Sequence, residues 1–225
     1  MDIRENLEKV QSNIAAAAAK AGRSPEDVEL VAVSKTFPSE TIREAVDAGQ
    51  LLFGENRVQE LLGKVPDLPA KVRWHLIGHL QSNKVRKVLP VVEMIQSVDS
   101  LELAYDINRI AGELGVFPKV LLEVNVAEET TKHGFTVSKL ESQLEDLLQC
   151  DRIEIHGLMC IPPVSEEPED SRKYFVLLRE VRARLEQMAG TKFPVLSMGM
   201  SGDYSVAVEE GATLVRVGSA IFGGR

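Results

Sequence analysis

The run Val28-Glu-Leu-Val-Ala-Val-Ser-Lys35 decides the fold of this chain, because it is short, largely apolar and lacks the alternation of a half-exposed strand. It predicts a strand that is buried on both faces and leads to a lysine. An ammonium group in such a place is costly to desolvate. Lys35 therefore either extends to solvent, as charged residues at strand ends commonly do, or reacts with a ligand.

Seven further apolar runs follow, and helical patterns stand between the runs. The predicted strands are 28–34, 51–54, 72–77, 94–98, 119–125, 153–159, 195–197 and 214–217. Apolar residues recur at helical spacing in 137–147 and 175–188, and a long helix is predicted over 2–21. Strands that alternate with helices pair in parallel, so eight such units predict an α/β fold, a single (β/α)8 barrel domain over 1–225 with an extra N-terminal helix.

An open doubly wound sheet is the alternative fold. It would require a glycine-rich turn after the first strand, and this chain has Ser34-Lys-Thr-Phe-Pro38 there. The segment 162–168, rich in proline and glutamate, is predicted to be a long loop after the sixth strand.

Composition argues against several classes of protein. The chain has 225 residues, 44% hydrophobic and 27% charged, with a formal net charge of −8 and a pI near 5.2. Scattered basic residues in an acidic chain do not indicate a nucleic-acid binder, and no apolar stretch or signal peptide indicates a membrane or secreted protein. We therefore expect a cytoplasmic protein. Cys150 and Cys160 are in no redox or metal-binding spacing, and the histidines show no paired spacing, so no metal site is predicted.

Two turns near the C-terminus are candidate anion sites. Ser197-Met-Gly-Met-Ser-Gly-Asp203 leaves the seventh strand, with Ser201 as the expected N-cap of a helix and free N–H groups at Gly202 and Asp203. Leu214-Val-Arg-Val-Gly-Ser-Ala220 ends the eighth strand, where Gly218 and Ser219 offer further donors. Either turn alone is equally well explained as a helix cap or a tight turn. Together, after strands seven and eight of a barrel, they favour phosphate binding.

Several polar residues at strand ends are open to two interpretations. Arg216 points either into the barrel, toward a carboxylate or ligand, or outward toward the helix of Glu209 and Glu210. Individual polar residues after the second and third strands are more often turn or satisfied core groups than ligand contacts. These residues are Asn56, His79, Gln81 and Asn83. His156 and Cys160 are weaker candidates.

These segments together resemble the pyridoxal phosphate homeostasis protein family, which is related to the barrel domain of alanine racemase. The matching segments are Ala32-Val-Ser-Lys35, Phe53-Gly-Glu-Asn56 with Val58-Gln-Glu60, Trp74-His-Leu-Ile-Gly-His79-Leu-Gln-Ser-Asn-Lys84, Gly157-Leu-Met-Cys-Ile-Pro-Pro163, Met198-Gly-Met-Ser201 and Val215-Arg-Val-Gly-Ser-Ala-Ile-Phe-Gly223. Their order and spacing cover nearly the whole chain.

The resemblance implies a cofactor, pyridoxal 5′-phosphate (PLP), and a set of residues that bind it. Lys35 would form a Schiff base with PLP, and Arg216 would face the pyridine nitrogen. Ser201, Gly218 and Ser219 would hold the phosphate, with Gly202 in the same turn, and Asn56 would lie near the cofactor. Many relatives have an acidic residue in place of Gly202 and threonine in place of Ser219, and neither change removes a backbone donor.

The same resemblance implies binding more readily than turnover. An arginine cannot give its proton to the pyridine ring, so the ring stays a weak electron sink. In alanine racemase a tyrosine base comes from a second domain, which we expect to be missing here because the chain ends just after the last strand. The leading hypothesis is a monomer that stores PLP, delivers it to PLP-dependent client enzymes and protects the cell from the free aldehyde.

Two other functions remain open from sequence. One is a minimal PLP-dependent amino-acid racemase in which His79, Tyr204 or a water molecule acts as the second base. The other is a class I aldolase-like barrel in which Lys35 attacks a sugar-phosphate carbonyl without a cofactor.

Overall fold

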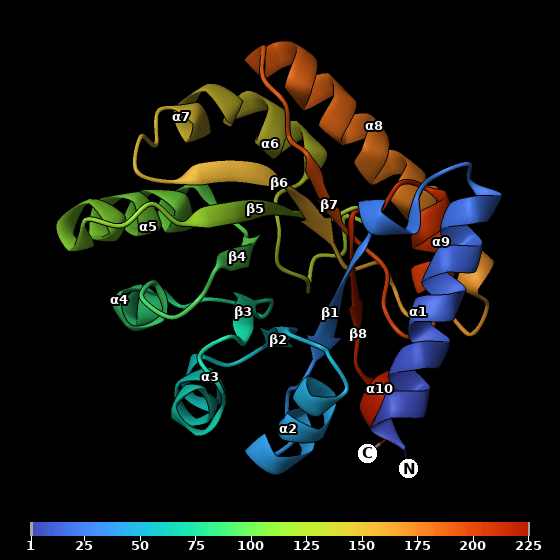
Figure 1. Ribbon diagram of the computed structural model, residues 1–225. Helices are drawn as coiled ribbons and strands as arrows, with labels where there is room; N and C mark the ends of the chain where they lie inside the picture. The colour runs from blue at the N-terminus through green and yellow to red at the C-terminus, as the bar shows by residue number, and fades with distance from the viewer. Residues whose placement is uncertain (1, 225) are drawn as a thin grey trace.

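The computed structural model describes residues 2–224, in which eight parallel strands close into a barrel in chain order (Figure 1). The first strand pairs with the last, as Val31 with Arg216, so the sheet has no open edge there. The strands are β1 (Glu29–Val33), β2 (Leu52–Glu55), β3 (Arg73–Leu76), β4 (Met94–Val98), β5 (Lys119–Val124), β6 (Glu154–Cys160), β7 (Val195–Ser197) and β8 (Leu214–Val217). The predicted barrel is confirmed, and the doubly wound alternative is wrong.

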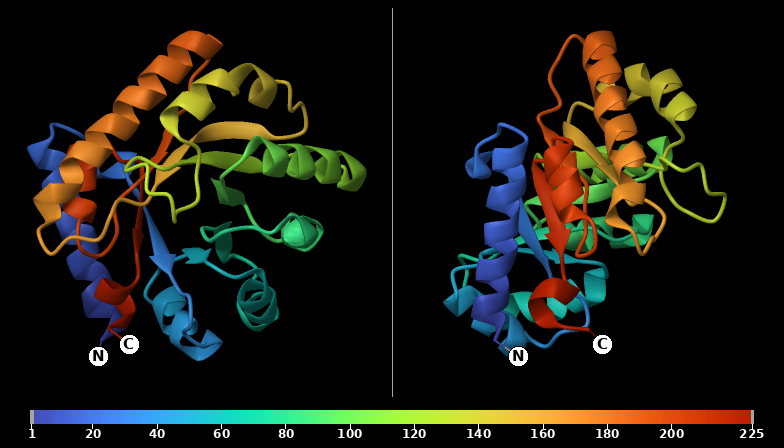
Figure 2. Two further views of the ribbon diagram at one scale, coloured as in Figure 1. Left: turned by 180° about the vertical axis from the view of Figure 1, so that it is seen from behind. Right: turned by 90° about the vertical axis from the view of Figure 1, so that its right-hand side faces the viewer.

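Helices connect successive strands and cover the outside of the barrel. The α-helices are α1 (Ile3–Lys20), α2 (Ser39–Asp47), α3 (Val58–Lys64), α4 (Val85–Val88), α5 (Leu101–Leu114), α6 (Val137–Ser142), α7 (Leu144–Leu148), α8 (Arg172–Ala189), α9 (Tyr204–Glu209) and α10 (Ser219–Phe222). Short 3-10 helices are η1 (Pro25–Asp27), η2 (Val65–Asp67), η3 (Ser82–Lys84) and η4 (Pro168–Ser171). The expected N-terminal helix is α1, and it lies along α9 and α10, which brings the two ends of the chain together (Figure 2).

Local sequence signals set the bounds of several helices. Asp2 caps α1 by accepting from the backbone N–H groups of its first turn, and Ser100 caps α5 in the same way. Gly115 ends α5 in the left-handed region, with φ of 67°. The helical pattern over 137–147 is not one helix, because Gln143, with φ −102° and ψ 4°, separates α6 from α7.

The inside of the barrel changes from apolar to polar toward the carboxyl ends of the strands. A separate buried cluster fills the interior and consists of Val31, Leu52, Met94, Leu121, Met159 and Leu214. Two residues further along their strands, Gln96 follows Met94 and Arg216 follows Leu214, and both are buried. Because strand side chains alternate with a period of two, these polar groups face the same interior. The barrel therefore has an apolar floor and polar groups near its mouth.

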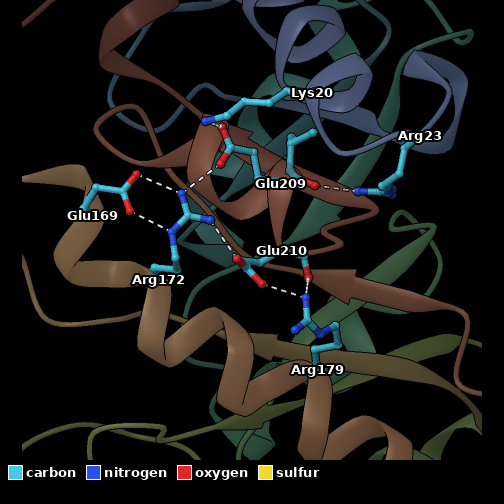
Figure 3. Close-up of polar contacts among 8 residues, drawn as sticks. Lys20, Arg23, Glu169, Arg172, Arg179, Glu209 and Glu210 are labelled. Carbon is cyan, nitrogen blue, oxygen red and sulfur yellow. Dashed lines mark hydrogen bonds and ion pairs between the residues drawn. The ribbon is translucent and has the colours of Figure 1, made fainter.

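A network of ion pairs joins α1, α8 and α9 on the outside of the barrel (Figure 3). Arg172 at the start of α8 contacts Glu169, Glu209 and Glu210, at 2.7–2.8 Å. Lys20 at the end of α1 reaches the Glu209 carboxylate at 2.7 Å. The network fixes the C-terminal end of α9, the helix that follows the predicted phosphate turn.

Within residues 2–224, no helix combines the length and apolarity needed to cross a membrane.

Candidate functional site

One cavity of about 460 Å³ opens at the carboxyl ends of β1, β2, β7 and β8. Its size is within the range of small-molecule sites, roughly 300–1,000 Å³. The structure brings together around it all the site residues selected from sequence, which are Lys35, Asn56, Ser201, Gly202, Arg216, Gly218 and Ser219. The carboxyl ends of barrel strands lie on one rim, so segments distant in sequence meet there.

Lys35 lies between two residues whose backbones are held by hydrogen bonds. Before it, the carbonyl oxygen of Ser34 accepts a hydrogen bond from Lys64 Nζ at 3.0 Å. After it, the N–H of Thr36 donates to Glu60 Oε2 at 3.0 Å, and this hydrogen bond lowers the pKa of the Glu60 carboxyl. Thr36 has φ of 70°, which is unusual for a β-branched residue and costs about 1–3 kcal/mol. The chain thus holds a strained turn that directs Lys35 into the cavity.

The two C-terminal turns meet at the hydroxyl of Ser201. Ser201 Oγ accepts from the backbone N–H of Gly218 at 3.2 Å and from that of Ala220 at 3.3 Å. Ser201 is not the N-cap of the next helix, so that prediction is wrong. α9 begins at Tyr204 with Asp203 in the cap position, and the Asp203 carboxylate accepts instead from the Met200 N–H at 2.7 Å. Ser201 connects the turns after β7 and β8.

Arg216 points into the barrel, which resolves the alternative left open by the sequence. Its guanidinium donates to Ser197 Oγ at 2.6 Å and to the Cys160 carbonyl oxygen at 2.8 Å. Burial lowers the pKa of Arg216, but an arginine stays protonated in proteins. Glu209 and Glu210, the outward partners considered above, are paired with other cations.

A buried relay of hydrogen bonds extends from Arg216 across the barrel. Ser197 accepts from Arg216, so its hydroxyl proton is free to donate to Gln96 Oε1 at 2.6 Å. The amide nitrogen of Gln96 then faces His75 Nδ1 at 2.8 Å. Burial lowers the pKa of His75 to about 4, so the ring is neutral and its Nδ1 accepts the hydrogen bond. The charge on Arg216 therefore sets the direction of every bond in the relay.

Asn56 lines the cavity and carries a buried polar atom. Its Oδ1 is without a hydrogen-bond partner among the described residues. Gly78 packs against the Asn56 backbone so closely that a Cβ at Gly78 would lie 2.3 Å from the Asn56 carbonyl oxygen. The position of Asn56 is thus fixed, and its side chain has capacity for one more contact.

Other residues that sequence reasoning considered lie away from this cavity. The hydroxyl of Tyr204 accepts from Asn13 of α1 at 2.9 Å. Gln81 and Asn83 are exposed near η3, and His156 is paired with Glu154 at 2.8 Å. Burial raises the pKa of the Cys160 thiol to about 12, so it is chemically inert.

His79 is part of a group that sequence reasoning missed. It pairs with Asp99 after β4, and His133 from the loop after β5 lies beside it. Nearby, burial and the Asp99 carboxylate raise the pKa of Glu123 on β5 to about 7. Only the barrel topology brings these residues together, because they lie after three different strands. From sequence, the one signal for this group was the rule that sites in such barrels form at the carboxyl ends of the strands.

Comparisons with known proteins agree with this geometry. The model of the family described as "Alanine racemase, N-terminal domain" matches residues 6–225. The pyridoxal phosphate homeostasis protein of Aquifex aeolicus (strain VF5) is 43% identical, over 100% of this chain and 99% of that protein. The protein of the same name from Escherichia coli (strain K12) is 39% identical, over 100% of this chain and 97% of its own length.

Solved structures of other proteins have the same fold. PipY of Synechococcus elongatus PCC7942, solved with PLP bound, has a TM-score of 0.86 and 42% identity, over 98% of this chain and 100% of that chain. Alanine racemase of Clostridium difficile 630 shares the fold, with a TM-score of 0.76 at 16% identity, over 100% of this chain and 57% of the racemase. The coverage and identity of the Aquifex aeolicus and Escherichia coli relatives show that this chain belongs to the pyridoxal phosphate homeostasis protein family, within the alanine racemase N-terminal domain family.

Proposed function

We propose that the chain binds PLP in the cavity at the barrel mouth and acts in the intracellular homeostasis of this cofactor. The observation that carries the proposal is that the Lys35 amine and the turns of Gly202 and Ser219, with their backbone N–H donors, share one cavity. PLP has an aldehyde for the first and a phosphate for the second. Residues 1–225 would act as a single PLP-binding domain.

The residues around the cavity fit this cofactor. The volume is that of a small-molecule site, and its lining includes Asn56, whose Oδ1 has no hydrogen-bond partner among the described residues. The relative PipY has been solved with PLP bound. When bound, PLP supplies an aldehyde that condenses with amines and a ring that withdraws electrons from them.

In this proposal each cavity residue has a separate task. Lys35 attaches PLP through a Schiff base, and the strained turn at Thr36 keeps its amine directed into the cavity. The turns joined by Ser201 bind the phosphate, with backbone donors from Gly202 and Ser219. Gly218 lies beside them, and its N–H, which donates to Ser201 Oγ here, is proposed to turn to the phosphate when PLP binds. Asn56 contacts the ring or its substituents.

Arg216 is proposed to face the pyridine nitrogen and to keep it unprotonated. The relay from Ser197 to His75 fixes the guanidinium, and an arginine does not give up its proton to the ring. A neutral ring stabilises a carbanion poorly. Storage and delivery to client enzymes are therefore favoured over turnover.

The alternative of a minimal racemase has less support. The Tyr204 hydroxyl contacts Asn13, His79 is paired with Asp99, and neither side chain considered as a base lines the cavity. Loss of α-deuterium from an amino acid, at a rate well above that with free PLP, would favour the racemase. An aldolase-like barrel would instead be colourless and trapped by borohydride only with a sugar phosphate.

The test is a visible spectrum of the purified protein with PLP, followed by borohydride reduction and peptide mapping. We expect a yellow protein with the label on Lys35, a colourless Lys35→Ala variant, and a normal Lys192→Ala control, since Lys192 is exposed and pairs only with Glu186 among the described residues. A label on another lysine, or a yellow Lys35→Ala variant at equal occupancy, would contradict the proposal. A second experiment tests delivery: the PLP-loaded protein is mixed with a PLP-dependent enzyme that lacks its cofactor, and recovery of that enzyme's activity is measured.

Cytoplasmic location and a monomeric state stay predictions. Light scattering checks the second.

A further inference from the structure

Two histidines converge on one carboxylate oxygen at the half of the barrel rim formed by β3, β4 and β5. His79 follows β3, Asp99 follows β4, and His133 lies in the loop after β5. His79 Nδ1 lies 2.8 Å and His133 Nδ1 3.5 Å from Asp99 Oδ2. The two imidazole rings are stacked, with centroids 4.0 Å apart. The cavity assigned to PLP lies on the other strands of the rim, apart from a contact with Ile77 just after β3.

An ordinary ion pair explains only half of this arrangement. One carboxylate can balance the charge of one protonated histidine. A second histidine that is stacked on the first and directed at the same oxygen therefore gains no comparable ion pair. The carboxylate is 9% exposed, whereas the imidazole side chains are 44% and 60% exposed. The group therefore has a largely buried carboxylate beneath two imidazole side chains that reach solvent.

The backbone is built to hold these three side chains together. Ser97 Oγ donates to the Gly78 carbonyl oxygen at 2.7 Å, which ties the end of β4 to the residue before His79. The loop after β5 folds back on its own strand, because the Phe135 N–H donates to the Glu123 carbonyl oxygen at 2.8 Å. Gly134, with φ of 110°, allows a contact in which a Cβ would lie 2.9 Å from the Asn125 nitrogen. This close approach places His133 over the barrel rim.

The geometry points to a metal site: we propose that His79, Asp99 and His133 bind a divalent transition-metal ion of the Zn²⁺ class, with water completing the coordination. Two imidazole nitrogens and one carboxylate oxygen are the ligands such ions prefer. The three ligand atoms already lie within 4.8 Å of one another. Ligands of a tetrahedral Zn²⁺ lie about 3.3–3.6 Å apart for bonds of about 2.0–2.2 Å. The His133 contact has this spacing, and the His79 contact needs to open by about half an ångström.

The experiment titrates chelator-treated, full-length protein with ZnCl₂ in a calorimeter, both with and without PLP, and repeats it with CoCl₂ in a spectrophotometer. We expect one ion per chain and a visible cobalt band in both forms. His79→Ala, His133→Ala and Asp99→Asn should each weaken binding by about tenfold or more, because even the loss of an outer-shell partner typically costs about 10–100-fold in metal affinity. His156→Ala is the matched control and should bind as the wild type does.

Two results would overturn the assignment. One is wild-type protein without saturable binding. The other is that His79→Ala and His133→Ala bind the metal as tightly as the wild type does. This includes the case in which the amount of bound metal depends only on the amount of bound PLP. Because both histidines are exposed, these variants should fold, and a thermal melt checks that they do.

Discussion

Lys64 Nζ lies 3.0 Å from the carbonyl oxygen of Ser34, in the wall of the barrel next to Lys35. The same ammonium is 2.6 Å from Glu55 Oε1, which also accepts from Ser34 Oγ at 2.7 Å. Glu55 is fully buried, and Lys64 is the cation paired with it in the described structure. A buried charge pair between α3 and the ends of β1 and β2 thus positions the residue before the proposed PLP lysine.

Removing Lys64 should destabilise the protein strongly. Lys64→Met leaves the Glu55 carboxylate buried without its cation, which costs about 3–5 kcal/mol of the free energy of unfolding. Urea unfolding measures the loss, and the double variant Glu55→Gln/Lys64→Met should recover part of it. Lys20→Met removes a largely exposed lysine and is the control. A loss no larger than that of the control would show that the buried pair contributes little.

His75 should make stability fall as the solution becomes acidic. Its pKa in the folded protein, about 4, is below the ordinary value of 6.5, so the unfolded chain takes up the proton first. The contribution of His75 to the free energy of unfolding is therefore fully present above pH 6.5 and is lost as the pH falls toward 4. The loss is roughly 2 kcal/mol between pH 7.5 and pH 5. His75→Gln should flatten this part of the urea-unfolding profile, and the control His156→Gln should not. Equal slopes in wild type and His75→Gln would refute the assignment.

Much of the fold was predictable because parallel strands leave a simple pattern. The bounds of β4, β7 and β8 match the predicted 94–98, 195–197 and 214–217, since these short runs are mostly apolar, lack alternation and are bounded by turns. The helical period over 137–147 could not show the interruption at Gln143, because the apolar face continues through it. Periodicity reports which face is buried, not whether the backbone is continuous.

The candidate site was predictable only where a motif follows its own strand. Lys35 and the turn at Gly218 each stand after an apolar run, and the barrel rule places both on one rim. Residues that come together from different elements leave no such spacing in the sequence. Lys64 reaches Ser34 from α3, and His133 reaches Asp99 from a loop, so both contacts required the structure.

The glycines at positions 218 and 202 should respond differently to the same substitution. A Cβ at Gly218 would lie 3.2 Å from the Val33 carbonyl oxygen, whereas one at Gly202 meets nothing within 4 Å. Gly218→Ala should therefore cost about 1–3 kcal/mol of stability by crowding the end of β1, and it should weaken PLP binding. Gly202→Ala should leave stability unchanged, and because it keeps the backbone N–H it should weaken PLP binding less than Gly218→Ala does. Thermal melts and PLP titration make the comparison, and equal effects would mean that the crowding at Val33 is relieved without cost.

The ion-pair network of Figure 3 should matter more than an isolated surface pair. Arg172 is about a third exposed and joins Glu169 to both Glu209 and Glu210, so Arg172→Met breaks contacts among η4, α8 and α9 at once. We expect a loss of about 1 kcal/mol at low ionic strength that shrinks in high salt, because solvent and ions screen the exposed part of the network. Arg86→Met, which removes an exposed pair with Glu113, should cost less than about half of that. Urea unfolding at two salt concentrations measures both variants. If the two losses were equal, the network would add nothing beyond its separate pairs, and the position of α9 would depend on its other contacts, such as the hydrogen bond from Asn13 of α1 to Tyr204.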